Sequence, residues 1–172
     1  ITGQNTTLAC TASGGPLKLE TGKRYYLSLR LANGAGLTAE AISTGIIIDD
    51  TPPPAPVVFD QGAYINPNQP LQANWFWSPE DPESGPNSYQ WTLIKDGQNL
   101  NTAVWQTGNE AKRIEITAAQ IKELFPYLSG GLAPDGSVYY FAVRVANQAG
   151  LSSIGMSNGI MADSTAPYIP EV

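Results

Sequence analysis

The sequence predicts an all-β protein built from two-sheet antiparallel sandwiches. Three observations support this prediction: short segments alternate apolar and polar residues, turn residues separate these segments, and one long stretch occurs twice. The chain contains 17 Gly and 14 Pro among 172 residues, with 42% hydrophobic and 14% charged residues. Such a composition is typical of short strands joined by turns, and it is too apolar for a disordered chain.

The repeated stretch defines the domain organisation. Residues 25–53 and 139–167 align without a gap at an offset of 114, and fourteen of the 29 positions are identical. A self-match of this length indicates a tandem array. We therefore expect residues 1–50 to be the C-terminal part of a truncated repeat, 51–164 a complete repeat, and 165–172 the start of a next repeat or a linker. The chain would then be a piece of a longer polypeptide, or the product of a natural cleavage.

The elements of the complete repeat follow from period-two alternation. Leu71, Ala73, Trp75 and Trp77 share one face of the first clear strand, and Tyr139, Phe141, Val143 and Val145 share one face of a later strand. Turn chemistry fills residues 78–86, 96–97 and 147–150. The expected strands are 71–77, 89–93, 104–105, 113–116, 139–146 and 151–162. With the remainder of the module the strands number about seven, and this number favours a sandwich.

One segment breaks the strand period. Thr117 is followed by Gln120 in the spacing of a capping box, and Ile121, Leu124 and Phe125 then fall on one side of a helix. Pro126 follows at once. The sequence therefore predicts a short helix near 118–125, between two strands, with an apolar side that plugs one end of the sandwich.

These residues resemble the fibronectin type III family of immunoglobulin-like sandwiches. The resemblance is carried by Trp75, Tyr89 and the segment 132–150, and it covers 51–164 as one module and 1–50 as the end of another. It implies that Tyr25 and Tyr139 form tyrosine corners. The segments 81–85 and 163–167 resemble repeats of large prokaryotic surface and secreted proteins, which implies an extracellular or cell-surface location. The helix and the length of the repeat depart from a typical module, and no Arg-Gly-Asp motif occurs.

Several classes of chemistry are excluded or disfavoured. The chain has no histidine, which removes Ser-His and Cys-His catalysis and most zinc sites. No phosphate loop or dinucleotide fingerprint occurs. A net charge of −6 without a basic cluster argues against nucleic acid, and no apolar run is long enough for a membrane span. Cys10 is the only cysteine, so no intrachain disulfide forms. We therefore expect no enzyme and no catalytic residue.

Two sets of residues are candidates for binding. Six acidic residues are candidate calcium ligands because hard cations take oxygen ligands from acidic loops: Asp49, Asp50, Glu80, Asp81, Glu83 and Asp163. Their spacing matches no specific calcium loop, and we expect a solvated loop without a cofactor, with calcium as the alternative. Trp75 and Trp91 are expected in the core, whereas Trp77 and Trp105 are candidates for stacking on a sugar.

The linker before the complete repeat points to a mechanical role. Residues 49–56 carry four prolines, which favour an extended, semi-rigid spacer. The sequence thus predicts a stalk or adhesion array whose partners are other repeats or domains of the same protein. A carbohydrate- or protein-binding module, or an accessory module of a polysaccharide-degrading enzyme, is the alternative. Because half a sandwich leaves the face of Tyr25, Leu27, Leu29 and Leu31 without its opposing sheet, we expect another chain to cover it.

Overall fold

A computed structural model describes residues 17–77, 81–133 and 136–168. The chain divides into two compact units, Ile1–Ile48 and Asp49–Val172, called unit 1 and unit 2 below. The strands of unit 2 are β5 (Val57–Asp60), β6 (Tyr64–Ile65), β7 (Leu71–Phe76), β8 (Pro86–Lys95), β9 (Gln106–Thr107), β10 (Arg113–Ile116), β11 (Val138–Asn147), β12 (Ser152–Met156) and β13 (Ile160–Ala162). Its helices are η1 (Leu100–Thr102), α1 (Ala118–Leu124) and η2 (Pro126–Leu128).

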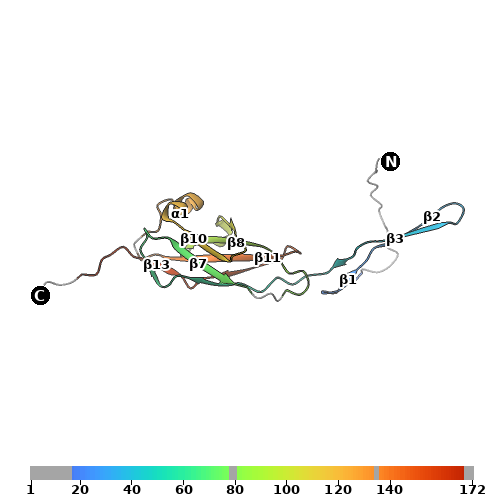
Figure 1. The fold of residues 1–172 in the computed structure, drawn as a ribbon, viewed down its shortest axis with the longest axis horizontal. Helices are drawn as coiled ribbons and strands as arrows, with labels where there is room; N and C mark the ends of the chain where they lie inside the picture. The colour runs from blue at the N-terminus through green and yellow to red at the C-terminus, as the bar shows by residue number, and fades with distance from the viewer. Residues whose placement is uncertain (1–16, 78–80, 134–135, 169–172) are drawn as a thin grey trace. The chain divides into compact units, whose positions relative to one another are not determined.

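Unit 2 is a two-sheet sandwich, as the alternation predicts (Figure 1). One sheet has the order β10-β7-β5, and the other has the order β6-β13-β11-β8-β9, with β12 also paired to β11. All pairs are antiparallel except β6 with β13. The core draws on the inward side chains of both sheets, among them Leu71, Trp75, Trp91, Phe141 and Val143. Trp75 and Phe141 are 3% and 0% exposed, which confirms the predicted strand register.

Helix α1 lies between β10 and β11, and its capping box is formed as predicted. The Thr117 side chain accepts a hydrogen bond from the Gln120 amide, and the Gln120 side chain accepts one from the Thr117 amide. Ile121 and Phe125 are fully buried and join the core cluster. Phe125 follows the helix as its C-cap, so the helix is one residue shorter than expected while the apolar side packs as predicted.

Three details of the predicted strands are wrong. Residues 104–105 form no strand, because η1 occupies the preceding turn and pairing with β8 begins only at Gln106. The expected strand 151–162 divides into β12 and β13. Between them, the Ser157 hydroxyl accepts a hydrogen bond from the Phe141 amide, and Gly159 adopts a left-handed conformation. Strands β5 and β6 were not assigned from the sequence, because Gly and Pro interrupt their short apolar runs.

Unit 1 repeats the final hairpins of unit 2. Its strands are β1 (Arg24–Tyr25), β2 (Ser28–Ala32), β3 (Thr38–Ile42) and β4 (Ile46–Ile47). β2 pairs with β3 in the register that β11 and β12 have 114 residues later, and β1 with β4 matches β11 with β13 in the same way. The hydroxyls of Tyr25 and Tyr139 each accept an upstream backbone amide, at 2.9 and 2.7 Å, as the expected tyrosine corners require.

The apolar face of β2 is exposed in unit 1. Leu27, Leu29 and Leu31 are 74%, 43% and 59% exposed, whereas Phe141, Val143 and Val145 at the equivalent positions of unit 2 are fully buried. The difference arises because β11 is covered by the opposite sheet of its sandwich. Coverage of the β2 face by another chain stays a prediction.

Candidate functional site

The structure brings three of the six candidate acidic residues together within unit 2. One carboxylate oxygen from each of Asp49, Asp81 and Glu83 lies within 4.8 Å of the others. Asp49 lies in the segment that enters β5, and the other two lie in the loop between β7 and β8. We call these three residues the acidic cluster.

Asp49 is fixed by a dense set of hydrogen bonds. Its Oδ1 accepts from the Thr51 amide at 3.1 Å, and its Oδ2 accepts from the Ser84 hydroxyl and from Asn147 Nδ2, the latter at 2.8 Å. The hydrogen bond from Ser84 is the main cause that lowers the pKa of Asp49, and those from Thr51 add to it against the opposing effect of burial. Asp49 is therefore a preorganised anion that joins the entering segment to β11.

Asp81 is the buried member of the acidic cluster, with only 6% of its surface exposed. Its Oδ1 accepts from the amides of Ser84 and Gly85 at 3.3 and 3.1 Å. Its Oδ2 is also buried, and it has no hydrogen-bond partner among the described residues. The expectation of a simply solvated loop is therefore wrong for Asp81, because the loop folds back and places this carboxylate inside. Sequence alone gives no signal for that burial.

Two of the other acidic candidates, Asp50 and Asp163, do not join the cluster. Asp50 is exposed, and Asp163 lies at the far end of the module, after β13, where its carboxylate accepts the Thr165 amide at 2.7 Å. Glu80 and Cys10 lie outside the described residues.

The two candidate tryptophans are both engaged by neighbouring side chains. Trp77 is 6% exposed and packs edge-on against Tyr89, with Lys112 Nζ 5.8 Å from its ring centre. Burial also raises the pKa of the Tyr89 hydroxyl. Trp105 is half-buried, and the Arg144 guanidinium lies 4.0 Å from its ring centre. Because a stacked sugar needs a free ring face, neither ring offers a ready platform on the side that its neighbour covers.

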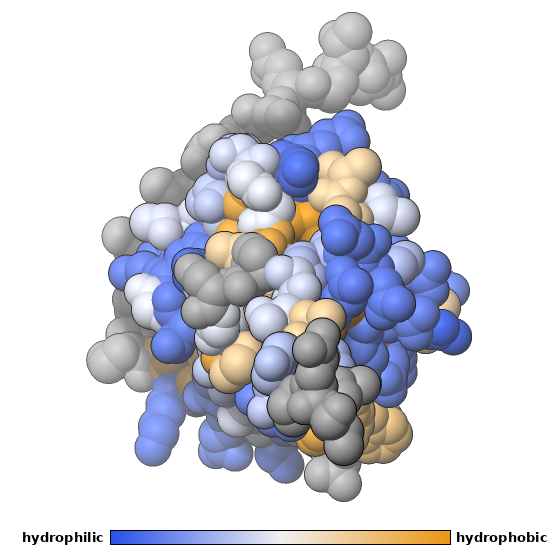
Figure 2. All heavy atoms as spheres, turned by 90° about the vertical axis from the view of Figure 1, so that its left-hand side faces the viewer, coloured by the Kyte–Doolittle hydropathy of each residue, from blue (hydrophilic) through white to orange (hydrophobic). Residues whose placement is uncertain are grey.

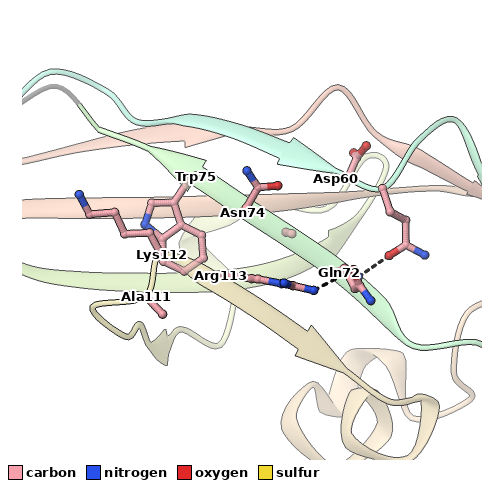
Figure 3. A pocket seen from close by; sticks show the side chains of 9 residues that line it. Asp60, Gln72, Asn74, Trp75, Ala111, Lys112 and Arg113 are labelled. Atoms are coloured by element: carbon pink, nitrogen blue, oxygen red, sulfur yellow. Dashed lines mark hydrogen bonds between the residues drawn. The ribbon is translucent and has the colours of Figure 1, made fainter.

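A depression of about 520 Å³ lies on the outer face of the β10-β7-β5 sheet (Figure 3). Its lining is polar, with Asp60, Asn74 and Lys112, and Arg113 donates a hydrogen bond to Gln72 at 3.3 Å. Asp60 is the single carboxylate in this lining, and it accepts the Gly159 amide at 3.1 Å. A glycosidase needs two carboxylates across a cleft, so this depression does not supply that chemistry.

Comparisons with known proteins were made for the sequence and the structure. No protein-family model and no curated protein matches the sequence. Among solved structures, domains A168–A170 of titin match 85% of this chain with a TM-score of 0.55 and 17% identity. Domains FN1–FN3 of chicken CNTN1 match 78% with a TM-score of 0.33 and 16% identity. This chain spans 43% and 44% of those two chains. No helix among the described residues is long and apolar enough to cross a membrane. The sheet order, the tyrosine corner and the titin match together show that the chain has a fibronectin type III-like fold.

Proposed function

We propose that unit 2 is a non-catalytic, load-bearing spacer module in a repeat array of a surface or secreted protein. The observation that carries this proposal is the parallel pair of β6 and β13, which joins the first part of the module to its last strand. The Met161 amide donates to the Ala63 carbonyl and the Asp163 amide donates to the Ile65 carbonyl, each at 2.9 Å.

The direction of these strands determines how they carry tension. The chain enters unit 2 at one end of the sandwich and leaves at the other (Figure 1). Tension on the chain reaches β6 through β5, which pairs with β7, and it pulls β6 towards its N-terminal end and β13 towards its C-terminal end. Because the strands are parallel, their hydrogen bonds are sheared together rather than opened one at a time. Such an arrangement favours resistance to forced unfolding, which depends on the unfolding barrier.

The proline-rich segment that enters the module is fixed to it at both ends. Asn147 Nδ2 donates to the Thr51 carbonyl at 3.0 Å as well as to Asp49. Further along, the Pro56 carbonyl packs against β12, where a Cβ added to Gly155 would lie 1.7 Å from the Pro56 oxygen. These contacts, added to the stiffness of proline, support a spacer whose entering segment is not a free hinge.

The surface at the opposite end of unit 2 is mixed where the structure describes it. On the face seen in Figure 2, hydrophobic residues form small patches among hydrophilic ones. Large exposed apolar patches usually mark docking sites, so this face favours a spacer over a module that binds a partner here.

Single-molecule pulling on the 172-residue chain tests the proposal. We expect one abrupt unfolding event whose contour gain is the extended length of the module, roughly 400 Å from 114 residues at about 3.5 Å each, less the end-to-end length of the folded module. Met161→Pro removes one donor of the β6–β13 pair and should lower the unfolding force. Phe125→Ala, which destabilises the core without touching that pair, should lower the force less for the same loss of stability. Gradual extension without an abrupt event would contradict a load-bearing role.

A further inference from the structure

The acidic cluster has the spacing of a divalent-ion site, and we propose that it binds one Ca²⁺ ion. Calcium binds oxygen ligands at about 2.3–2.6 Å, so two oxygens on one ion lie at most about 5 Å apart. The oxygens from Asp49, Asp81 and Glu83 all lie within 4.8 Å of one another. Each pair of these oxygens is therefore close enough to share a single ion.

The buried oxygen of Asp81 is the independent observation that points to a ligand. Its Oδ1 already accepts two backbone amides, whereas its Oδ2 is buried without any hydrogen-bond donor among the described residues. Burying an oxygen of a carboxylate without a partner is costly, and native proteins rarely leave one in that state. A cation bound at this oxygen would supply the missing partner.

No Lys or Arg side chain neutralises the acidic cluster. All nine Lys and Arg residues fall within the part of the chain that the structure describes, and none of the three carboxylates forms a salt bridge there. Asp49 is held by neutral donors, from Ser84, Asn147 and Thr51. Three clustered carboxylates without a counter-ion repel one another, and a divalent ion removes that repulsion.

The donor set selects the kind of metal. All three side chains offer oxygen alone, which suits a hard cation and disfavours zinc or copper. Ca²⁺ tolerates irregular geometry from loops and completes its shell with water, whereas Mg²⁺ demands a near-octahedral site and rarely binds through an all-protein cage. The ion would tie the segment entering β5 to the β7–β8 loop, and so fix the path by which the chain enters the module.

Asp163 provides a matched control within the same chain. It occupies the position equivalent to Asp49 at the offset of 114, and its carboxylate accepts a backbone amide two residues later, as Asp49 does. Asp163 lacks neighbouring carboxylates among the described residues, so it shares the local turn without the cluster.

The test is a calcium titration of the full 172-residue chain after chelator treatment, followed by amide NMR and by the urea midpoint. We expect one site with a dissociation constant of about 10⁻⁴–10⁻³ M, the range of extracellular modules. The amides of Ser84, Gly85 and Thr51 should shift, and the urea midpoint should rise with calcium. Glu83→Gln, which alters a half-buried side chain and keeps its size, should weaken binding at least tenfold while the calcium-free protein stays folded. Asp163→Asn should bind like the unaltered chain.

Several results would overturn the proposal. The first is that the three amides do not shift at a calcium concentration 50 times the expected dissociation constant. The second is that Glu83→Gln binds calcium as tightly as the unaltered chain. The third is that Asp163→Asn loses as much calcium affinity as Glu83→Gln. Equal affinity for Mg²⁺ would overturn the assignment to calcium. Asp81→Asn is a second variant: with calcium its midpoint should no longer respond, and a response equal to that of the unaltered chain would show that the buried carboxylate takes no part.

Discussion

Replacing Phe125 by alanine tests whether helix α1 is part of the core rather than a surface insertion. Phe125 is fully buried, its ring packs edge-on against Trp91 at 5.6 Å between centroids, and it also contacts Tyr127 at 5.8 Å. Truncating a buried Phe costs about 3–5 kcal/mol, of which aromatic contacts of this kind contribute about 0.5–1.5 kcal/mol. Since a domain is stable by about 5–15 kcal/mol, the variant should fold with much of its stability lost.

Urea unfolding followed by tryptophan fluorescence measures this loss in unit 2 alone. The four tryptophans all lie between residues 75 and 105, so unit 1 contributes no tryptophan signal. With a slope of about 2 kcal/mol per molar urea, a loss of 4 kcal/mol shifts the midpoint by about 2 M. The slope itself should not change, because the same core is exposed on unfolding.

Phe76→Ala is the matched control for this measurement. Phe76 has the same side chain but lies on the outer face of β7, where it is 63% exposed. Its truncation should cost less than about 1 kcal/mol. If Phe125→Ala costs no more than Phe76→Ala, the helix does not plug the sandwich and the reasoning from its apolar side fails.

Three further predictions follow from single contacts. Gly155→Ala should destabilise unit 2 by about 1–3 kcal/mol or prevent its folding, because the added Cβ meets backbone, whereas Gly130→Ala, with nothing within 4 Å of its added Cβ, should cost little in the same urea assay. Because burial raises the folded-state pKa of Tyr89, the stability that its neutral form supplies should be present below pH 10 and fall as the pH rises beyond it. Tyr89→Phe should remove that part of the alkaline loss, and an unchanged pH profile would refute the assignment. In hydrogen–deuterium exchange of the isolated chain, residues 25–31 should exchange much faster than residues 139–145, since the β2 face is exposed; equal protection would show that another contact covers it.

Local patterns predicted most of the architecture because their physics is local. The capping box of Thr117 and Gln120 satisfies two amides within four residues, so its sequence signature is sufficient. The alternation in β7 and β11 likewise predicts which side chains face the core. Long-range contacts carry no such signature. Nothing in the neighbourhood of Asp81 indicates that the loop turns inward, and nothing near Gly155 indicates that the Pro56 carbonyl lies against it.

The candidate site was only partly predictable for the same reason. The acidic residues were visible as a group, but their separation along the chain gave no means of choosing among them. The structure selects Asp49, Asp81 and Glu83 because Ser84 holds the entering segment against the β7–β8 loop, while Asn147 ties the same segment to β11. Those two polar contacts span 98 and 35 residues of sequence, which is beyond the reach of pattern reasoning.

Comparison of the two copies distinguishes residues that contact the backbone from residues that fill the core. Ser43 and Ser157 each accept the amide at the equivalent strand position, and Gly45 and Gly159 each adopt positive φ beneath a tyrosine ring, where a Cβ would lie 2.8 or 2.6 Å away. These residues are identical in the two copies, in keeping with their contacts to the backbone and, for the glycines, with the absence of room for a Cβ.

At several core positions, by contrast, the side chains differ between the two copies. Leu27 pairs with Phe141, and Leu29 with Val143, since a core position tolerates any apolar side chain of suitable volume. Asp49 and Asp163 belong with the residues that contact the backbone, because each accepts the amide of the residue two positions later. Asparagine or serine also forms a turn of this kind. Asp49 differs from Asp163 in its neighbours: among the described residues only Asp49 lies beside two further carboxylates, those of Asp81 and Glu83, and it is this difference on which the proposed cation site rests.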